Sequence, residues 1–120
     1  MKILIVDDSK AMRMIVMRHL RQAGFGNHTL EEAANGVEAL NAATASPPDL
    51  ILCDWNMPEM NGLDFLKALR GKKMNTPFGF VTTESSPEMR QTAVGAGAAF
   101  LIAKPFTVET FETTLSPFLK

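Results

Sequence analysis

The fold of this chain is decided near its start by the stretch ILIVDD, residues 3–8. Four consecutive apolar residues predict a strand buried on both faces, because a strand with one face in water would alternate apolar and polar residues. The run stops abruptly at two aspartates, where the strand is expected to leave the core. Strands of this kind belong to parallel sheets that carry helices on both sides.

Four more strands and five helices follow when the pattern is traced along the chain. Strands are predicted at residues 3–6, 28–33, 50–53, 77–82 and 99–103. A helix follows each strand: Ser9 caps the first and Gly24 ends it, Ser85 opens the fourth, and Pro117 is expected to fray the last turn of the fifth. This alternation predicts an α/β fold, a three-layer sandwich with a parallel five-stranded sheet and right-handed crossovers.

Length and composition restrict the classes of protein to consider. A chain of 120 residues is the size of one compact domain, so we expect a single domain over residues 1–120 with no output domain. The net charge of −1 and the scattered basic residues argue against a nucleic-acid partner. No apolar run predicts membrane insertion and no signal peptide is evident. The single cysteine, Cys53, fits a cytoplasmic protein and is interpreted as a buried structural residue.

Side chains able to do chemistry stand at the carboxyl ends of four predicted strands. Asp7 and Asp8 follow the first strand and Asp54 follows the third, while Thr82 and Lys104 stand at the ends of the fourth and fifth. Because parallel strands end at one edge of the sheet, these side chains are expected to converge. Three carboxylates in one place repel each other unless a cation intervenes, and a site made only of oxygen ligands suits Mg²⁺.

A phosphoryl group on Asp54 would make use of every member of this set. The Asp54 carboxylate would act as the nucleophile, Mg²⁺ would neutralise the transferring oxygens, and Lys104 with Thr82 would hold the remaining ones. The alternative is that these residues are ordinary helix caps and solvated turns. Complementary chemistry at four strand ends favours the phosphoryl hypothesis.

The same residues resemble a known family over the whole chain. The segments DWNMP (residues 54–58) with Gly62, VT (81–82), KPF (104–106) and the acidic pair 7–8 are similar to the response-regulator receiver domain, in particular to its stand-alone, CheY-like members. The resemblance implies the flavodoxin-like strand order 2-1-3-4-5. It also implies a two-component response regulator that catalyses only its own phosphorylation and dephosphorylation and is otherwise no enzyme.

Partners follow from the resemblance alone. It implies a sensor histidine kinase as phosphoryl donor and a downstream target protein reached by direct contact, of the chemotaxis or motility type, and it leaves room for a phosphatase. A phosphorelay intermediate or phosphate sink is an open alternative.

Two other functions on related sheets fit the sequence less well. A haloacid-dehalogenase-like phosphatase also forms an aspartyl phosphate, but its nucleophile follows the first strand and has a second aspartate two residues on. Here the candidate follows the third strand, and Asn56 stands two residues later. A flavin-binding module would need its first loop to cradle a phosphate, which the acidic pair at residues 7–8 would repel.

The resemblance also implies individual roles around the site. Asp8, Asp54 and the backbone carbonyl of Asn56 would bind Mg²⁺, with Asp7 acting mainly through water. Asn56 and Glu84 would flank the phosphoryl group and tune its lifetime.

Switching in this family couples the threonine to an aromatic residue three positions before the lysine. In this chain Thr82 is present, but the aromatic position holds Leu101, and the nearest aromatic residue is Phe100. The switch residue could thus be Leu101 or Phe100, although neighbouring strand residues point to opposite faces. The Lys104–Pro105 peptide bond is expected to be cis.

Overall fold

The computed structural model describes residues 1–83 and 85–119 and contains one parallel five-stranded sheet in the order β2-β1-β3-β4-β5. Its strands are β1 (Lys2–Val6), β2 (Thr29–Ala33), β3 (Leu50–Cys53), β4 (Phe78–Thr82) and β5 (Phe100–Ala103). Its helices are α1 (Lys10–Leu20), continued by a short π-helical turn η1 (Arg21–Phe25), α2 (Gly36–Ala45), α3 (Gly62–Gly71), α4 (Pro87–Gly95) and α5 (Val108–Leu119). The predicted fold class and strand order are confirmed.

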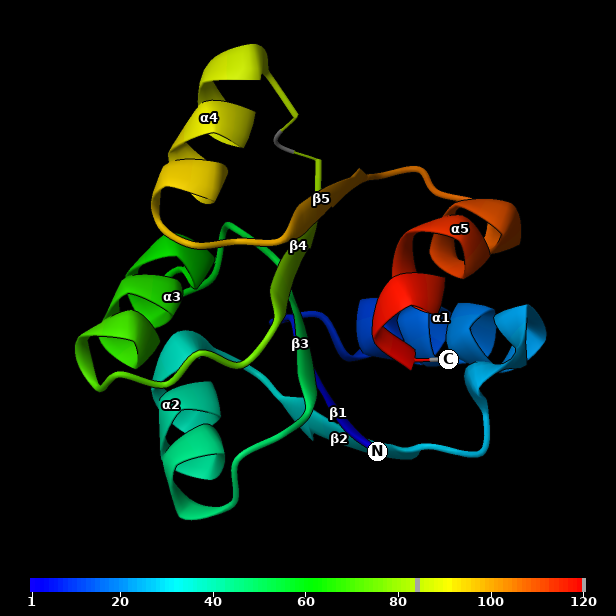
Figure 1. Cartoon of the computed structure of the whole chain (residues 1–120), viewed down its shortest axis with the longest axis horizontal. Helices are drawn as coiled ribbons and strands as arrows, with labels where there is room; N and C mark the ends of the chain where they lie inside the picture. Colours follow the sequence, from blue (N-terminus) through cyan, green and yellow to red (C-terminus); the bar gives the residue numbers. More distant parts are fainter. Residues whose placement is uncertain (84, 120) are drawn as a thin grey trace.

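The helices form two layers, one on each face of the sheet. Figure 1 shows α2, α3 and α4 on one face and α1 and α5 on the other. Strand β1 divides its side chains between the two resulting cores: Leu4 and Val6 join the core under α2 to α4, while Ile3 and Ile5 join the core under α1 and α5. All four are at most 1% exposed. The apolar run that opens the sequence is therefore a strand buried on both faces.

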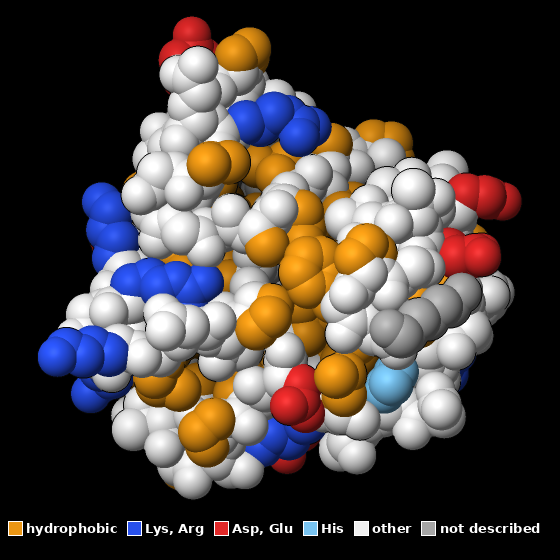
Figure 2. Space-filling model, viewed as in Figure 1, with side chains coloured by type: hydrophobic (Ala, Val, Ile, Leu, Met, Phe, Trp, Pro, Cys, Tyr) orange, Lys and Arg blue, Asp and Glu red, His pale blue; other side chains and the backbone are white. Residues whose placement is uncertain are grey.

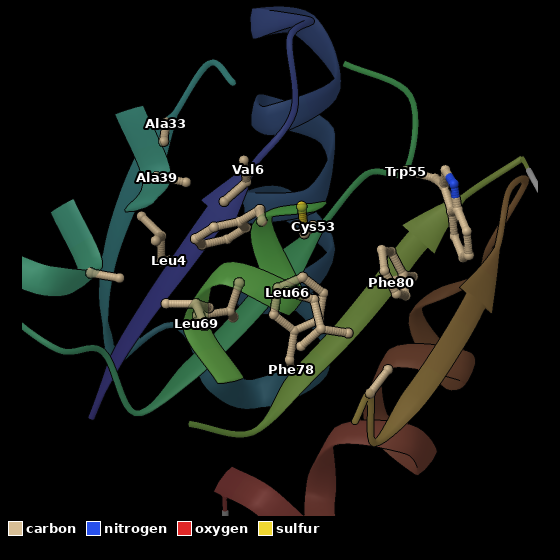
Figure 3. Close-up of a cluster of buried hydrophobic side chains, with 14 of the residues drawn as sticks. Leu4, Val6, Ala33, Ala39, Cys53, Trp55, Leu66, Leu69, Phe78 and Phe80 are labelled. Atoms are coloured by element: carbon tan, nitrogen blue, oxygen red, sulfur yellow. The ribbon is translucent and has the colours of Figure 1, made fainter. Parts of the chain in front are cut away.

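Aromatic side chains fill the core under α2 to α4. Phe78 and Phe80 of β4 pack edge to face, with ring centroids 5.1 Å apart. The indole of Trp55 lies over Phe80 at 4.6 Å, as the close-up in Figure 3 shows. Burial of such large rings is a major source of stability. Because Trp55 is the second residue after β3, its burial also anchors the loop that leaves the strand.

The ends of the helices follow the sequence signals with two corrections. Ser9 caps α1 by accepting a hydrogen bond from the Met12 amide, and Gly24 has the left-handed φ of +97° expected at a helix end. The expected cap Ser85 is wrong, since Ser86 accepts the bond from the Met89 amide and α4 begins one residue later.

Helix α5 provides the second correction. Pro117 does not fray its last turn, because the helix continues to Leu119. Phe118 and Leu119 pack against the core under α1 and α5. This packing holds the final turn although proline lacks an amide to donate.

One close contact in the sheet gives a test of the packing. A Cβ atom added at Gly79 of β4 would lie 1.9 Å from the Phe100 ring, which occupies that space from β5. We expect Gly79→Ala to lower the free energy of unfolding by about 1–3 kcal/mol through overpacking. Urea titration followed by circular dichroism measures the change.

The matched control is Gly95→Ala, because a Cβ at Gly95 would meet no atom within 4 Å. This variant should unfold at the wild-type urea concentration or above. The double variant Gly79→Ala/Phe100→Ala should be more stable than the sum of the single changes predicts, since the clash is gone. Full additivity would contradict the proposed clash.

Candidate functional site

The sheet itself positions the site residues, because its hydrogen-bond ladders continue one step past the strands. The Asp54 amide donates to the Val6 carbonyl at 2.9 Å, and the Lys104 amide donates to the Thr82 carbonyl at 2.9 Å. The Asp7 amide is bonded in the same way, at 3.1 Å, to the carbonyl of the last residue of β2. The backbones that carry these functional side chains are thus as fixed as the strands.

Three carboxylates converge at this edge. Asp7, Asp8 and Asp54 each present an oxygen, and these oxygens all lie within 4.8 Å of one another. Asp7 is buried, Asp54 is partly buried and Asp8 is exposed, so the cluster extends from the core to the solvent. A set of oxygen ligands open to water on one side could hold a hard divalent cation.

Lys104 supplies a positive charge to the cluster. Its Nζ lies 3.2 Å from Oδ2 of Asp7 and 3.6 Å from Oδ2 of Asp54. The ammonium group therefore offsets part of the repulsion between these two carboxylates. The Lys104–Pro105 peptide bond is cis, the isomer that the resemblance implies.

The charge of the buried carboxylate is only partly compensated. Burial raises the pKa of Asp7 above its usual value, and the nearby Asp54 raises it further. The Ser9 amide, which donates to Oδ1 at 2.9 Å, and the Lys104 ammonium act in the opposite direction, but the raising effects are larger. A cation bound here would therefore relieve an electrostatic cost that the protein alone does not remove.

The Asp54 carboxylate is oriented at both oxygens. Its Oδ1 accepts a hydrogen bond from the Trp55 amide at 2.7 Å, while Oδ2 faces Lys104. Gly62 passes so close that a Cβ there would lie 2.1 Å from the Asp54 carbonyl oxygen. The glycine is therefore required for the loop after β3 to fold back against the site.

The cysteine thiol beside the site is held in its unreactive, protonated form. Cys53 is fully buried, as predicted, and its Sγ donates to the Asp54 carbonyl. Burial, followed by the charges of Asp54 and Asp7, raises the pKa of the Cys53 thiol well above its usual value. The thiolate needed for reaction is thereby disfavoured.

The two candidates for the switch residue lie on opposite faces of the sheet. Leu101 is paired with Phe80 and packs against the core under α2 to α4, whereas Phe100 packs against the other core and contacts Phe118 at 5.4 Å. Thr82, which is fully buried, is two residues after Phe80 and so shares the face of Leu101.

Two predicted site residues remain, Asn56 and Glu84. Asn56 is exposed in the loop after β3. Glu84 lies outside the described residues.

One neighbour of the site was missed by the sequence reasoning. Arg13 on α1 donates from Nη1 to the Asp7 carbonyl at 2.5 Å and forms an ion pair with Glu32 of β2 at 2.9 Å. In the sequence, Arg13 cannot be distinguished from the exposed basic residues near it, because nothing in the local pattern marks an arginine one turn into a helix.

The surface carries charges of both signs. On the face drawn in Figure 2, lysine and arginine side chains form separate islands, most of them on the side of α3 and α4, and apolar side chains run between them and the α5 side. Within residues 1–83 and 85–119, no helix has the length and apolar character needed to cross a bilayer.

Comparison with known protein families gives one match that spans most of the chain. Residues 3–116 match the model of the response regulator receiver domain. Chemotaxis protein CheY-3 of Vibrio cholerae serotype O1 is 41% identical over 117 residues, which cover 96% of this chain and 88% of that protein. The chemotaxis protein CheY homolog of Campylobacter jejuni is 39% identical over 122 residues, which cover 99% of this chain and 92% of that protein.

Solved structures give the same result at the level of the fold. The structure of chemotaxis protein CheY4 of Vibrio cholerae superposes with a TM-score of 0.86 at 42% identity, over 98% of both chains. The receiver domain of the Francisella response regulator 1452 reaches a TM-score of 0.88 at 26% identity, over 98% of this chain and 95% of that one.

The raised pKa of Asp7 predicts a pH dependence of stability. Between the unfolded-state pKa of 3.8 and the higher folded-state pKa, the folded protein binds more protons than the unfolded chain. The contribution of Asp7 to the free energy of unfolding is therefore largest below 3.8 and decreases as the pH rises through the folded-state pKa.

Comparison with Asp7→Asn isolates this effect, because asparagine does not titrate. In the presence of a chelator, the free energy of unfolding of the wild type relative to that of the variant should fall as the pH is raised from about 3 to about 7. Urea unfolding at pH values about one unit apart measures this difference. A difference that stays constant with pH would contradict the prediction. A difference that increases with pH would mean that the Lys104 pairing outweighs burial.

Proposed function

This chain belongs to the response regulator receiver domain family, and we propose that it is a phosphoryl-accepting switch in which Asp54 carries the phosphoryl group. The observation that supports this assignment most directly is the setting of the Asp54 carboxylate. One oxygen is held by the Trp55 amide, and the other faces Lys104 inside a cluster of three carboxylates. An attacking oxygen is thus fixed beside groups that can bind the oxygens of a transferring phosphoryl group.

We propose Mg²⁺ as the cation of this site. The donors are all oxygen atoms, which Mg²⁺ prefers, and the raised pKa of Asp7 indicates negative charge that the protein leaves uncompensated. Asp8, Asp54 and the Asn56 backbone carbonyl would be its ligands, with Asp7 acting mainly through water. When bound, the ion would supply positive charge to the oxygens of the transferring group.

The proposed transfer is an in-line displacement at phosphorus. An Asp54 carboxylate oxygen attacks the phosphorus of a phosphohistidine on a sensor histidine kinase, a P–O bond forms, and the P–N bond breaks with its electron pair returning to the imidazole. Lys104 and the Thr82 hydroxyl bind the phosphoryl oxygens in this scheme. Attack of water on the aspartyl phosphate later releases phosphate and restores the carboxylate, and Asn56 and Glu84 would tune that rate.

The signal would leave the domain by protein contact. We propose that phosphorylation draws the Thr82 hydroxyl toward the phosphoryl group and that Leu101, which shares its face of the sheet, repacks in response. The target would be a component of a motility system, because the relatives of 39% and 41% identity are named chemotaxis proteins. A phosphatase that shortens the signal would fit the same site.

Phosphorylation by a small-molecule donor tests the proposal. Purified protein incubated with acetyl phosphate and Mg²⁺ should gain the mass of one phosphoryl group, seen by intact-mass spectrometry, and lose it slowly after the donor is removed. The chelated sample should show no adduct, because the cation stabilises the transferring oxygens.

Asp54→Asn is the matched control, since it preserves the shape of the side chain and removes the nucleophile. This variant should stay unmodified while retaining the wild-type circular dichroism spectrum. An adduct of equal yield in Asp54→Asn would place the acceptor elsewhere. If the wild type itself gains no mass, incubation with a phosphorylated histidine kinase decides whether Asp54 is an acceptor at all.

A further inference from the structure

We propose that Arg13 is a positioning residue for the cation site, acting as a clasp that ties the Asp7 backbone to strand β2. Its guanidinium contacts both sides of this connection: Nη1 donates to the Asp7 carbonyl at 2.5 Å, and Nε pairs with Oε1 of Glu32 at 2.9 Å. This inference rests on the proposed function, because its consequence is the affinity of the carboxylate cluster for Mg²⁺.

The two polar groups of the Asp7 backbone both lead to the end of β2. The Asp7 amide donates to the carbonyl of Ala33, and the Asp7 carbonyl reaches the side chain of Glu32 through Arg13. Glu32 and Ala33 are the last two residues of that strand. The first residue of the acidic pair is therefore held from two directions by the strand beside it.

The second tie adds to the ladder bond from the Asp7 amide to Ala33, at the point where the register of β1 with its neighbours ends. Strand β2 is the edge strand beside β1, as Figure 1 shows, and its register with β1 ends at the pair Val6 and Ala33. Beyond that pair the chain must turn into α1, which starts at Lys10. Without the clasp, Asp7 would keep its amide bond to Ala33 but lose the tie at its carbonyl, so the turn that carries Asp7 and Asp8 would shift more easily relative to Asp54.

The two contacts of the clasp suit arginine better than lysine. The guanidinium group presents several donors in a rigid plane, so one side chain can reach a carbonyl and a carboxylate at once. A lysine would keep the charge but offers a single nitrogen on a flexible chain. The Arg13 side chain is 13% exposed and that of Glu32 is 40% exposed, so the carbonyl end of the clasp is the better shielded one.

Loss of the clasp and loss of its charge act in opposite directions on a bound cation. Removal of a positive charge near three carboxylates would strengthen Mg²⁺ binding if electrostatics alone mattered. Removal of a group that holds a residue of the metal site in place, as Arg13 would hold Asp7, weakens metal binding, typically by about 10- to 100-fold. The sign of the change therefore separates the two accounts.

The experiment is titration of the full chain with MgCl₂ by isothermal calorimetry, below the unfolding temperature of every variant. We expect Arg13→Ala to raise the Kd for Mg²⁺ by about 10-fold. Arg13→Lys, which keeps the charge, should raise it by a smaller factor. Phosphorylation by acetyl phosphate should be slow in Arg13→Ala at limiting Mg²⁺ and should recover at saturating Mg²⁺.

Arg18→Ala is the matched control, because Arg18 is an exposed arginine of the same helix and its loss changes the net charge equally. Its Kd should stay at the wild-type value or fall slightly. Glu32→Ala removes the far end of the clasp while leaving Arg13 in place. We expect Glu32→Ala to raise the Kd for Mg²⁺ as well. The Kd of the double variant Arg13→Ala/Glu32→Ala should be no higher than that of Arg13→Ala alone, because both changes break the same connection.

The outcomes separate this inference from the function on which it rests. If the wild type binds Mg²⁺ and Arg13→Ala binds it equally well or more tightly, the clasp is refuted and the proposed function stands. If the wild type binds no Mg²⁺, the proposed function fails first. A rise in Kd that Arg18→Ala reproduces would be a general charge or stability effect and would also refute the clasp.

Discussion

Three carboxylates, from Asp7, Asp8 and Asp54, present oxygens within 4.8 Å of one another, and like charges at that distance repel. The surrounding structure holds these three carboxylates together in spite of their repulsion. Extended sheet ladders fix the backbones, the Ser9 and Trp55 amides bind carboxylate oxygens, and Lys104 places an ammonium between two of the three acids. The repulsion that remains would favour the cation that we propose for this site.

The rigidity of the site comes from a sheet buried on both faces. Strand β1 sends alternate side chains into two separate cores, so neither helical layer can move without disturbing the strand that ends in Asp7. The loop after β3 is anchored in the same way, since Trp55 stacks on Phe80 directly after Asp54. Close-packed interiors transmit small displacements instead of absorbing them. The arrangement is therefore suited to passing a change at Asp54 to the surface of β5.

The chain departs from its family at the position that would receive such a change. Leu101 lies where the resemblance implies an aromatic residue, and Phe100 is turned to the opposite face, where it covers Gly79 and packs on Phe118. An aliphatic side chain can repack but has no ring to swing inward. The proposed response at this face is thus a shift in packing, and Phe100 acts as a structural residue that joins β5 to α5.

The sequence by itself determined the elements, their alternation and the identity of the acidic, hydroxyl and basic residues at the strand ends, because burial on two faces and helix caps leave local patterns. Strand order came from resemblance, since alternation does not specify which strands are neighbours. Only the tertiary structure decided how these residues act together: that Asp7 is buried and Asp8 exposed, that Lys104 reaches Asp7 from 97 positions away, and that Arg13 connects Asp7 to Glu32. Ser86, not Ser85, caps α4 for the same reason, because either serine satisfies the local pattern and the path of the chain selects one. Contacts between residues distant in the chain depend on the packing of whole elements, and no local pattern encodes them.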